Sequence, residues 1–191
     1  MNDMGLGRFL VRDIAPWEGP RVFAMTGDRA VMKYMGFKVH DTVDEARDLI
    51  AQYRNSPSRW QAVCLDGDPA DILGIIGFEV LGYTAAVTIM FRRDWKARGA
   101  GREFSVPFVQ WIFTHPQIWR VWAYCHPDNI AVQRVLERMG AEREGWLRRF
   151  AVFPNLSAEP QDVYSYSIVR QNVNGVAAKP WNIEPIPPPL A

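Results

Sequence analysis

The chain has 191 residues, a size that suits one domain or one domain with a tail. Its apolar content of 48% is ample for a packed core, and its formal charge of +1 gives no reason to expect a nucleic acid or an anionic membrane as partner. No apolar run approaches the roughly 20 residues of a membrane helix, and no signal peptide is evident. The two cysteines form no CxxC motif, and the three histidines lack metal-ligand spacing. We therefore expect a cytoplasmic protein without a metal.

The first half of the chain predicts a strand, helical segments and then a meander of strands. The first three elements are expected at residues 8–12, 17–26 and 29–35. Thr42 and Glu45 have the spacing of a capping box, in which each side chain serves the other's backbone donor. The helix that they open ends near Pro57. Apolar runs then predict three consecutive strands, at residues 60–65, 72–80 and 85–91.

The second half predicts two further helices and three further strands. They are expected as a helix to about residue 115, a strand at 119–125, a helix to Gly140, and strands at 141–153 and 162–169. Asp128 or Asn129 caps the second of these helices. The predicted domain therefore covers residues 1–172. Residues 173–191 are rich in proline, and we expect an extended or disordered tail there.

A basic, glycine-containing stretch, residues 92–103, lies between the predicted strand at 85–91 and the helix after it. It carries five Arg or Lys residues and two acidic ones. Helix N-termini offer unpaired N–H groups and the positive end of the helix dipole, and small residues let an anion approach the main chain. The small residues here are Ala97, Gly99, Ala100 and Gly101. We therefore expect a ligand with several negative charges, although an ordinary tight turn with solvated charges has a similar pattern.

The segment from Lys96 to Gly101 can be compared with known phosphate-binding loops. It lacks the Gly-Lys-Ser/Thr of a P-loop, and Phe104 occupies the place of the third glycine of a dinucleotide fingerprint. It does resemble the acetyl-CoA pyrophosphate loop of the GNAT superfamily of N-acetyltransferases, Q/R-x-x-G-x-G/A, with Lys96 in the first place.

Further blocks resemble the RimJ/RimL branch of that superfamily and extend the resemblance over most of residues 8–170. They lie, in the expected order, at residues 121–131, 135–141, 144–149 and 162–170. The last matches a closing "RDxxxYSxxR" strand, with Gln161 in place of the first Arg. The resemblance implies an α+β GNAT fold: a mixed, mostly antiparallel central sheet of six to seven strands flanked by about four helices.

The resemblance also implies a binding mode for acetyl-CoA as co-substrate. A main-chain N–H at Met90 or Phe91 would donate to the thioester oxygen, where two strands splay apart. Backbone N–H groups from Arg98 to Arg102, including those of Gly99, Ala100 and Gly101, would hold the pyrophosphate. Asn129 would contact the cofactor near its pantetheine arm, besides its alternative role as helix cap. Four side chains would add positive charge, those of Arg93, Lys96, Arg98 and Arg102.

Both residues that serve as general acid in relatives are replaced. Where the RimJ/RimL branch usually has Ser this chain has Val132, and where other members have Tyr after the helix Leu it has Glu137. A thiol with a pKa of about 8.5 can still leave without prior protonation.

The general base that the branch often carries is also absent, since Ala86 occupies the position of its Glu. Glu79 on the neighbouring strand is the best substitute, because a partly buried carboxylate can act as a base, although an outward-facing strand residue would have the same pattern. Tyr83 and His40 are weaker candidates.

The resemblance predicts an acetyl-CoA-dependent N-acetyltransferase that uses direct transfer in a ternary complex. The acceptor is a primary amine, either a protein N-terminus or a small molecule, so an open groove and a closed aromatic pocket are the two alternatives. The second hypothesis is a non-catalytic acyl-CoA-binding module that kept the donor site. The eight Trp residues allow a homodimer interface, although a buried core accounts for most of them.

Overall fold

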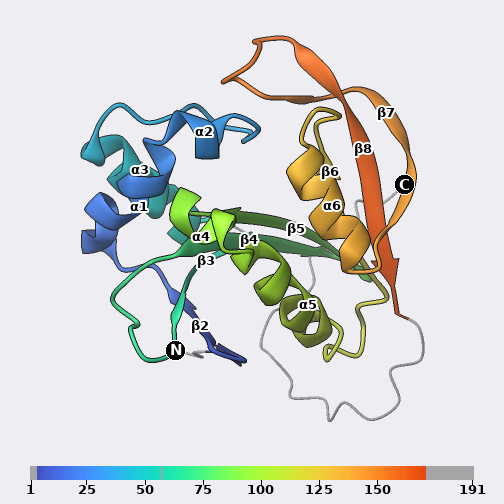
Figure 1. Ribbon diagram of the computed structural model, residues 1–191, viewed down its shortest axis with the longest axis horizontal. Coiled ribbons are helices and arrows are strands. Elements are labelled where there is room, and N and C mark those ends of the chain that lie inside the picture. The colour runs from blue at the N-terminus through green and yellow to red at the C-terminus, as the bar shows by residue number, and fades with distance from the viewer. Residues whose placement is uncertain (1–3, 57, 171–191) are drawn as a thin grey trace.

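The computed structural model describes residues 4–56 and 58–170, and within them an eight-stranded sheet carries six α-helices (Figure 1). The strands are β1 (Met4–Leu6), β2 (Phe9–Asp13), β3 (Arg59–Leu65), β4 (Gly74–Leu81), β5 (Thr84–Phe91), β6 (Arg120–Cys125), β7 (Glu142–Val152) and β8 (Pro160–Val169). The helices are α1 (Gly19–Thr26), α2 (Arg29–Met32), α3 (Val43–Arg54), α4 (Arg93–Ala97), α5 (Ala100–Ile112) and α6 (Ile130–Arg138). A 3₁₀ turn, Pro16–Glu18, precedes α1.

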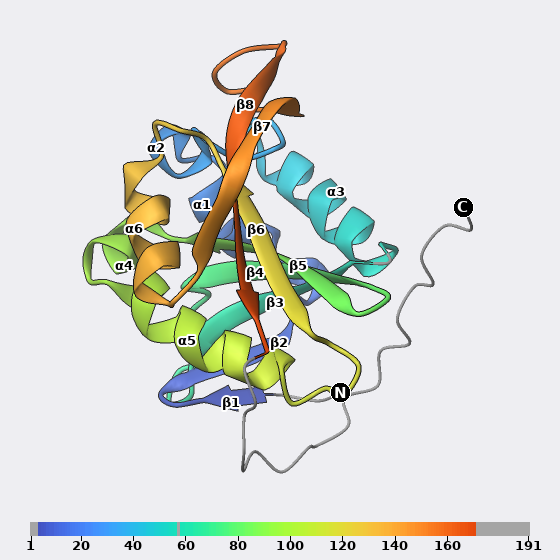
Figure 2. The same cartoon turned by 90° about the vertical axis from the view of Figure 1, so that its right-hand side faces the viewer.

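The strand order is β1-β2-β3-β4-β5-β6-β8-β7, and every neighbouring pair is antiparallel except β5 with β6. That parallel pair extends only from Thr84–Arg120 to Ala86–Trp122. Beyond it the two strands diverge, so that β3–β5 run across the molecule while β6, β8 and β7 stand nearly upright (Figures 1 and 2). A wedge-shaped gap therefore opens between the last residues of β5 and those of β6.

Helices cover both faces of the sheet because their apolar residues recur at helical spacing. On one face α5 buries Phe104, Phe108 and Ile112 against the strands. On the other face α1–α3 bury Met25, Ile50 and their neighbours against β3–β5. A smaller cluster joins α6 to β6 and β8. The gap thus has the N-termini of α5 and α6 on one face of the sheet and α1–α3 on the other.

The predicted α+β class, with a mixed and mostly antiparallel sheet, is confirmed, but the element count was too low. The structure adds β1, which is only three residues long and therefore shows no periodicity, and α4, which lies inside the stretch predicted as a loop. α4 forms because Trp95 is buried in the main core. The proline-rich tail predicted at residues 173–191 lies outside the described residues.

The hairpin between β7 and β8 reaches across the top of the gap to the loop after α2 (Figure 1). Asn155 in this hairpin makes three hydrogen bonds to that loop. Its Oδ1 accepts the N–H of Val39 at 2.8 Å, and its Nδ2 donates to the carbonyls of Met32 and Phe37 at 2.7 and 2.9 Å. We call this contact the Asn155 seam. It ties the two diverging parts of the sheet together at the wide end of the gap.

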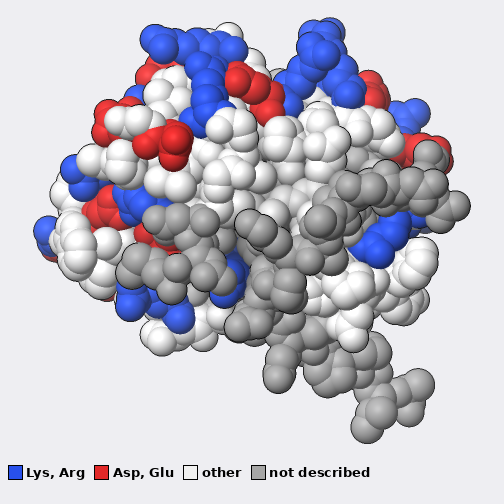
Figure 3. All heavy atoms as spheres, turned by 90° about the horizontal axis from the view of Figure 1, so that it is seen from below, with Lys and Arg blue, Asp and Glu red and all other residues white. Residues whose placement is uncertain are grey.

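An aromatic stack supports the seam. The ring of Tyr34, which follows α2, stacks on His126 with centroids 5.2 Å apart, and the edge of Phe153 meets His126 at 5.3 Å. The Tyr34 hydroxyl also donates to the carbonyl of Asp128 at 3.3 Å. On the face shown in Figure 3, Lys and Arg are interspersed with Asp and Glu.

Candidate active site

The start of α5 leaves two backbone N–H groups without a hydrogen-bond partner among the described residues. Gly99 has a φ of 79°, the left-handed conformation that glycine adopts without strain, and this turns the chain from α4 into α5. The N–H groups of Arg98 and Gly99 bond to carbonyls of α4, and that of Arg102 bonds to the carbonyl of Gly99. The N–H groups of Ala100 and Gly101 precede the first such bond of α5 and point out of its N-terminus. Of the five predicted pyrophosphate donors, these two are unoccupied.

The approach is open at Gly101, whereas Ala100 is buried. A Cβ placed on Gly101 would meet only the ring of Phe91, at 4.0 Å, and one placed on Gly99 would have no neighbour within 4 Å. An oxygen-rich ligand can therefore reach the main chain at this point.

Three exposed cations surround the start of α5. The guanidinium of Arg98 lies over the Trp95 ring, 5.3 Å from its centroid. The side chains of Lys96 and Arg102 make no hydrogen bond or ion pair within the part of the chain that the structure describes. Arg98 and Arg102 lie within three residues of Gly101, and Lys96 lies in α4 just before it, so their charges add to the positive end of the helix dipole.

The other two basic residues of the stretch are already paired with acids. Arg92 binds Asp94 at 2.9 Å and Asp71 at 2.6 Å, and these hydrogen bonds raise the pKa of its guanidinium. Arg93, predicted to face the pyrophosphate, forms an ion pair of 2.7 Å with Asp28, the N-cap of α2. The structure therefore places Arg93 as a link between α4 and α2.

The edge of β5 that faces the gap presents unpaired backbone groups. The carbonyl of Tyr83, just before β5, accepts the N–H of Trp119 on the β6 side, whereas the N–H of Arg92, just after β5, bonds to Leu73 on the β4 side. Since backbone direction alternates along a strand, Phe91 points toward β6 and Met90 toward β4. Their partner strand has separated by then, so Phe91 is the better placed of the two predicted thioester donors.

On the α1–α3 face of the sheet, Glu79 stands directly opposite Ala86. The register pairs Glu79 with Ala86 across β4 and β5, and Ala86 with Trp122 across β5 and β6. Residues opposite each other in a sheet share a face, and neighbouring strands lie about 4.8 Å apart. The carboxylate of Glu79 and the indole of Trp122 therefore flank the small Ala86. Within the described residues the Glu79 carboxylate has no hydrogen-bond or ion-pair partner.

The structure does not bring Tyr83 to the gap. Tyr83 lies in the turn between β4 and β5, 64% exposed, at the end where β5 and β6 are still paired. His40 lies in the loop before α3, with its ring 5.9 Å from that of Phe37 and its Nδ1 buried without a partner in residues 4–56 and 58–170. Burial lowers the pKa of His40, which favours its neutral form.

Asn129 precedes α6 beside the gap. Its carbonyl accepts the first backbone bonds of the helix, but its side chain makes no capping hydrogen bond. The amide of Asn129 is therefore free of the helix-capping role that the sequence offered as an alternative, and can serve a ligand.

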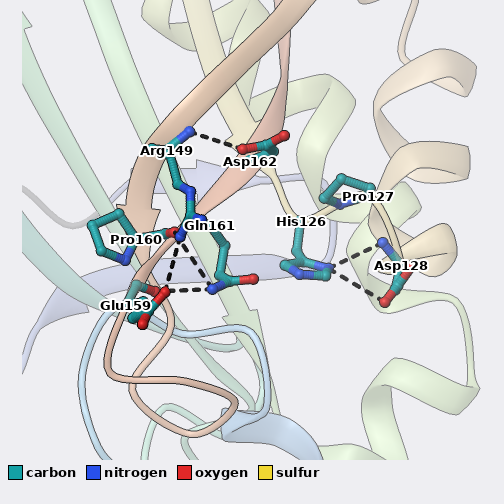
Figure 4. A pocket seen from close by; sticks show the side chains of 8 residues that line it. All are labelled: His126, Pro127, Asp128, Arg149, Glu159, Pro160, Gln161 and Asp162. Carbon is teal, nitrogen blue, oxygen red and sulfur yellow. Dashed lines mark hydrogen bonds and ion pairs between the residues drawn. The ribbon is translucent and has the colours of Figure 1, made fainter.

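A polar hollow of about 510 Å³ lies between the start of α6 and the β7–β8 hairpin (Figure 4). Its lining residues are His126, Pro127, Asp128, Arg149, Glu159, Pro160, Gln161 and Asp162. Most of its charges are already engaged. Arg149 binds Glu159 at 3.0 Å, and His126 Nδ1 accepts the N–H of Asp128 at 3.1 Å. No group of three or more His, Cys, Asp or Glu with metal-binding geometry occurs among the described residues.

Three aromatic residues beside the gap were missed by sequence reasoning, namely Trp122, Tyr124 and Phe150. Ala123 and Cys125 pack under α6, so the alternation of β6 turns Trp122 and Tyr124 to the face of Glu79. The alternation itself was visible in the sequence. Which side faces the gap was not, since that depends on the pairing of β6 with β5.

The sequence profile of the acetyltransferase (GNAT) domain matches residues 8–142. The chain belongs to the GNAT family. The uncharacterized N-acetyltransferase YnaD of Bacillus subtilis (strain 168) is 25% identical to this GNAT protein over 168 residues, covering 87% of this chain and 96% of YnaD.

No helix of the described residues is long and apolar enough to cross a membrane.

Solved structures of this family share the fold. A GNAT-family acetyltransferase from Bacillus anthracis superposes with a TM-score of 0.75 at 25% identity, covering 88% of this chain and 98% of that one. RimL, described as a ribosomal L7/L12 alpha-N-protein acetyltransferase in complex with coenzyme A, gives a TM-score of 0.72 at 13% identity over 93% of this chain and all of its own. The GNAT fold expected from the sequence is thus confirmed.

Proposed function

We propose that this GNAT protein transfers the acetyl group of acetyl-CoA directly to a primary amine. The observation that carries the proposal is the gap between β5 and β6. On one face of the sheet the gap meets the free N–H groups at the start of α5, and on the other it meets the unpaired carboxylate of Glu79. A donor and an acceptor bound on opposite faces would meet at the edge of β5.

The donor side has a group for each part of acetyl-CoA. The N–H groups of Ala100 and Gly101 hold the pyrophosphate, with added charge from Lys96, Arg98 and Arg102. The pantetheine pairs with the free edge of β5, and the Phe91 N–H donates to the thioester oxygen as negative charge develops on it. Several solved structures with this fold hold coenzyme A or acetyl-CoA, among them RimL and the microcin C7 immunity acetyltransferase MccE.

On the acceptor side Glu79 acts as the general base. The amine nitrogen attacks the thioester carbon while Glu79 takes its proton, directly or through a water, and the tetrahedral intermediate then loses the thiolate of coenzyme A. The low pKa of a thiol, about 8.5, lets it leave without an acid, which is consistent with Val132 and Glu137 at the usual acid positions. Glu79 thus supplies a carboxylate in place of the Glu that Ala86 replaces, from the directly opposite position on the next strand.

A non-catalytic acyl-CoA-binding module is the second candidate, and the identity of Glu137 favours it. This residue, which follows the helix Leu where other family members carry a Tyr acid, instead accepts the hydroxyl of the buried Tyr166 at 3.3 Å. It is therefore occupied in packing α6 against β8.

Calorimetric titration with acetyl-CoA, followed by thiol-release assays with a panel of primary amines, tests both candidates. We expect saturable 1:1 binding, coenzyme A release with at least one amine, and a kcat about a hundredfold lower in Glu79→Gln at neutral pH. Glu142→Gln, which removes an exposed carboxylate from β7 in the same row of the sheet, is the matched control and keeps its kcat.

The remaining outcomes support the binding module or overturn part of the proposal. Binding without coenzyme A release from any amine supports the binding module. No binding to the wild type overturns both candidates, and an unchanged kcat in Glu79→Gln removes Glu79 from the mechanism.

A further inference from the structure

Strand β7 carries a bulge at an unusual backbone position. Its register against β8 shifts between Leu147 and Ala151, so that four steps along β7 match two along β8. Within the bulge Arg149 has a φ of 50°, and it is the one residue other than glycine with a positive φ among residues 4–56 and 58–170. This left-handed conformation costs about 1 kcal/mol for a residue with a Cβ, so it persists only where surrounding contacts hold it.

Asp162 on β8 provides those contacts. Its Oδ1 accepts the backbone N–H of Arg149 at 2.9 Å, and its Oδ2 accepts the Trp146 Nε1–H at 2.7 Å. One carboxylate therefore fixes both sides of the bulge. The side chain of Arg149 adds its ion pair with Glu159.

The bulge turns Phe150 onto the face of the sheet that carries Glu79. The ring of Phe150 meets Tyr124 edge-on, with centroids 5.2 Å apart, and Tyr124 lies 6.5 Å from Trp122. Phe150 is nevertheless 48% exposed and Tyr124 is 41% exposed. We call these three residues the aromatic wall. It begins at Trp122, beside Ala86 and Glu79, and follows the diverging edge of β6 along the gap.

We propose that the aromatic wall is the acceptor's specificity subsite, with Phe150 as a specificity-determining residue, and that the acceptor is a small primary amine with an aromatic or other bulky apolar body. This inference rests on the proposed function, since it assumes that Glu79 marks the place of the reacting nitrogen. Bulges near active sites commonly re-aim a side chain, and here the residue that follows the strained Arg149 is Phe150.

Charge and size support this class of acceptor. An ammonium group is attracted by the unpaired carboxylate of Glu79, while an apolar body on the same molecule covers rings that are otherwise half exposed to water. The Asn155 seam links the two sides of the gap at its wide end. A site bridged at that end, with a wall of three rings, suits a small amine better than the N-terminus of a folded protein.

The test compares 2-phenylethylamine with ethylamine, two amines that differ only by the phenyl ring. We expect the wild type to show a kcat/KM at least tenfold higher for 2-phenylethylamine. In Phe150→Ala this ratio falls toward one, while the KM for acetyl-CoA is unchanged. Asp162→Ala, which keeps the ring but releases the bulge, changes the ratio in the same direction. Leu156→Ala, which truncates an exposed apolar side chain in the same hairpin, is the matched control and keeps the wild-type ratio.

A ratio near one in the wild type, or an unchanged ratio in Phe150→Ala, overturns the inference while the proposed function stands. If neither amine is acetylated, calorimetric titration of 2-phenylethylamine into the protein saturated with coenzyme A decides the question. Binding that is lost in Phe150→Ala supports the aromatic wall even though the proposed reaction has then failed for this amine. Absent binding, or equal binding in both proteins, overturns the inference.

Discussion

Gly101 shows how a single residue can separate ligand binding from folding. It lies in the first turn of α5 with an ordinary backbone conformation and open space around it, whereas Gly99, two residues earlier, needs its positive φ. A substitution at Gly99 would therefore strain the chain whatever its effect on a ligand. A substitution at Gly101 changes mainly the access to the main chain.

We predict that Gly101→Ala weakens acetyl-CoA binding about tenfold and leaves the fold intact. A methyl group in a helix raises intrinsic helix stability by about 0.5 kcal/mol, so the midpoint of thermal unfolding should be equal or slightly higher. Calorimetric titration and thermal unfolding measure the two effects separately. Gly36→Ala, at another open glycine, is the control and keeps wild-type affinity. Unchanged affinity in Gly101→Ala would place the phosphates elsewhere.

A second residue-scale prediction concerns Glu144, which accepts a hydrogen bond from Ser167, the residue opposite Trp122. The Arg120 guanidinium, with a further hydrogen bond from Ser167, lowers the pKa of Glu144 from its ordinary 4.5 to about 2. Because the pKa of Glu144 is lower in the folded protein than in the unfolded chain, its ionised carboxylate stabilises the fold. This stabilisation is present above about pH 4.5 and is lost as the pH falls toward 2. The carboxylate is 39% exposed, which limits the effect to about 1 kcal/mol.

Glu144→Gln should accordingly be less stable than the wild type at pH 7 and nearly equal to it at pH 2. Urea unfolding of both proteins across this range measures the difference. A difference that stays constant with pH would show that the stabilisation of Glu144 does not depend on its charge.

At the scale of elements, the Asn155 seam joins segments that no local pattern connects. The β7–β8 hairpin and the loop after α2 are more than a hundred residues apart in the chain, yet one side chain satisfies three backbone groups of that loop. The seam therefore sets the width of the gap at the end where β5 and β6 no longer pair.

We predict that Asn155→Ala lowers the free energy of unfolding by about 2 kcal/mol, because buried backbone groups lose their partner. It should also raise the rate at which acetyl-CoA is hydrolysed without an amine, since a wider gap admits water to the thioester. Asn55→Ala removes an asparagine whose Nδ2 bonds only to the carbonyl of Ala51, and it serves as the control. Thiol release in the absence of amine distinguishes the seam from a purely structural contact, for which only stability would change.

Most helices and strands were predicted from sequence, whereas β1 and α4 were not. α3 follows from its capping box and its apolar stripe, and α6 follows from its apolar stripe. β1 and α4 form only because a neighbouring strand or a buried Trp95 stabilises them, which no local window contains. In the candidate site, the small residues around Gly101 led to the prediction of an anion-binding loop, which stays a prediction.

The remaining site residues depend on pairing and register. That Glu79 faces Ala86 follows from the two-residue turn between β4 and β5, and a slip of one residue would have turned Glu79 to the α5 face. The position of Phe150 depends on a bulge at Arg149. Since a positive φ is usually predicted from a glycine, the sequence gives no signal for this bulge. The role of Asn155 depends on contacts across the whole chain.

At the scale of the whole molecule, the candidate donor and acceptor groups lie on opposite faces of the sheet. The start of α5 lies on the first face, while Glu79 and the aromatic wall lie on the second. In the proposed mechanism neither substrate has to pass the binding site of the other in order to enter or leave. This independence predicts a particular pattern of steady-state kinetics.

Because the two substrates approach from opposite faces in the proposed mechanism, we predict that neither has to bind first. Double-reciprocal plots for acetyl-CoA and the amine should intersect to the left of the axis, and coenzyme A should inhibit competitively against acetyl-CoA but not against the amine. Parallel lines would instead indicate an acetylated protein intermediate and would contradict direct transfer. In this arrangement each product can leave on the face of the sheet from which its substrate arrived. The two substrates are then kept apart by the face on which they bind and not by the order in which they bind.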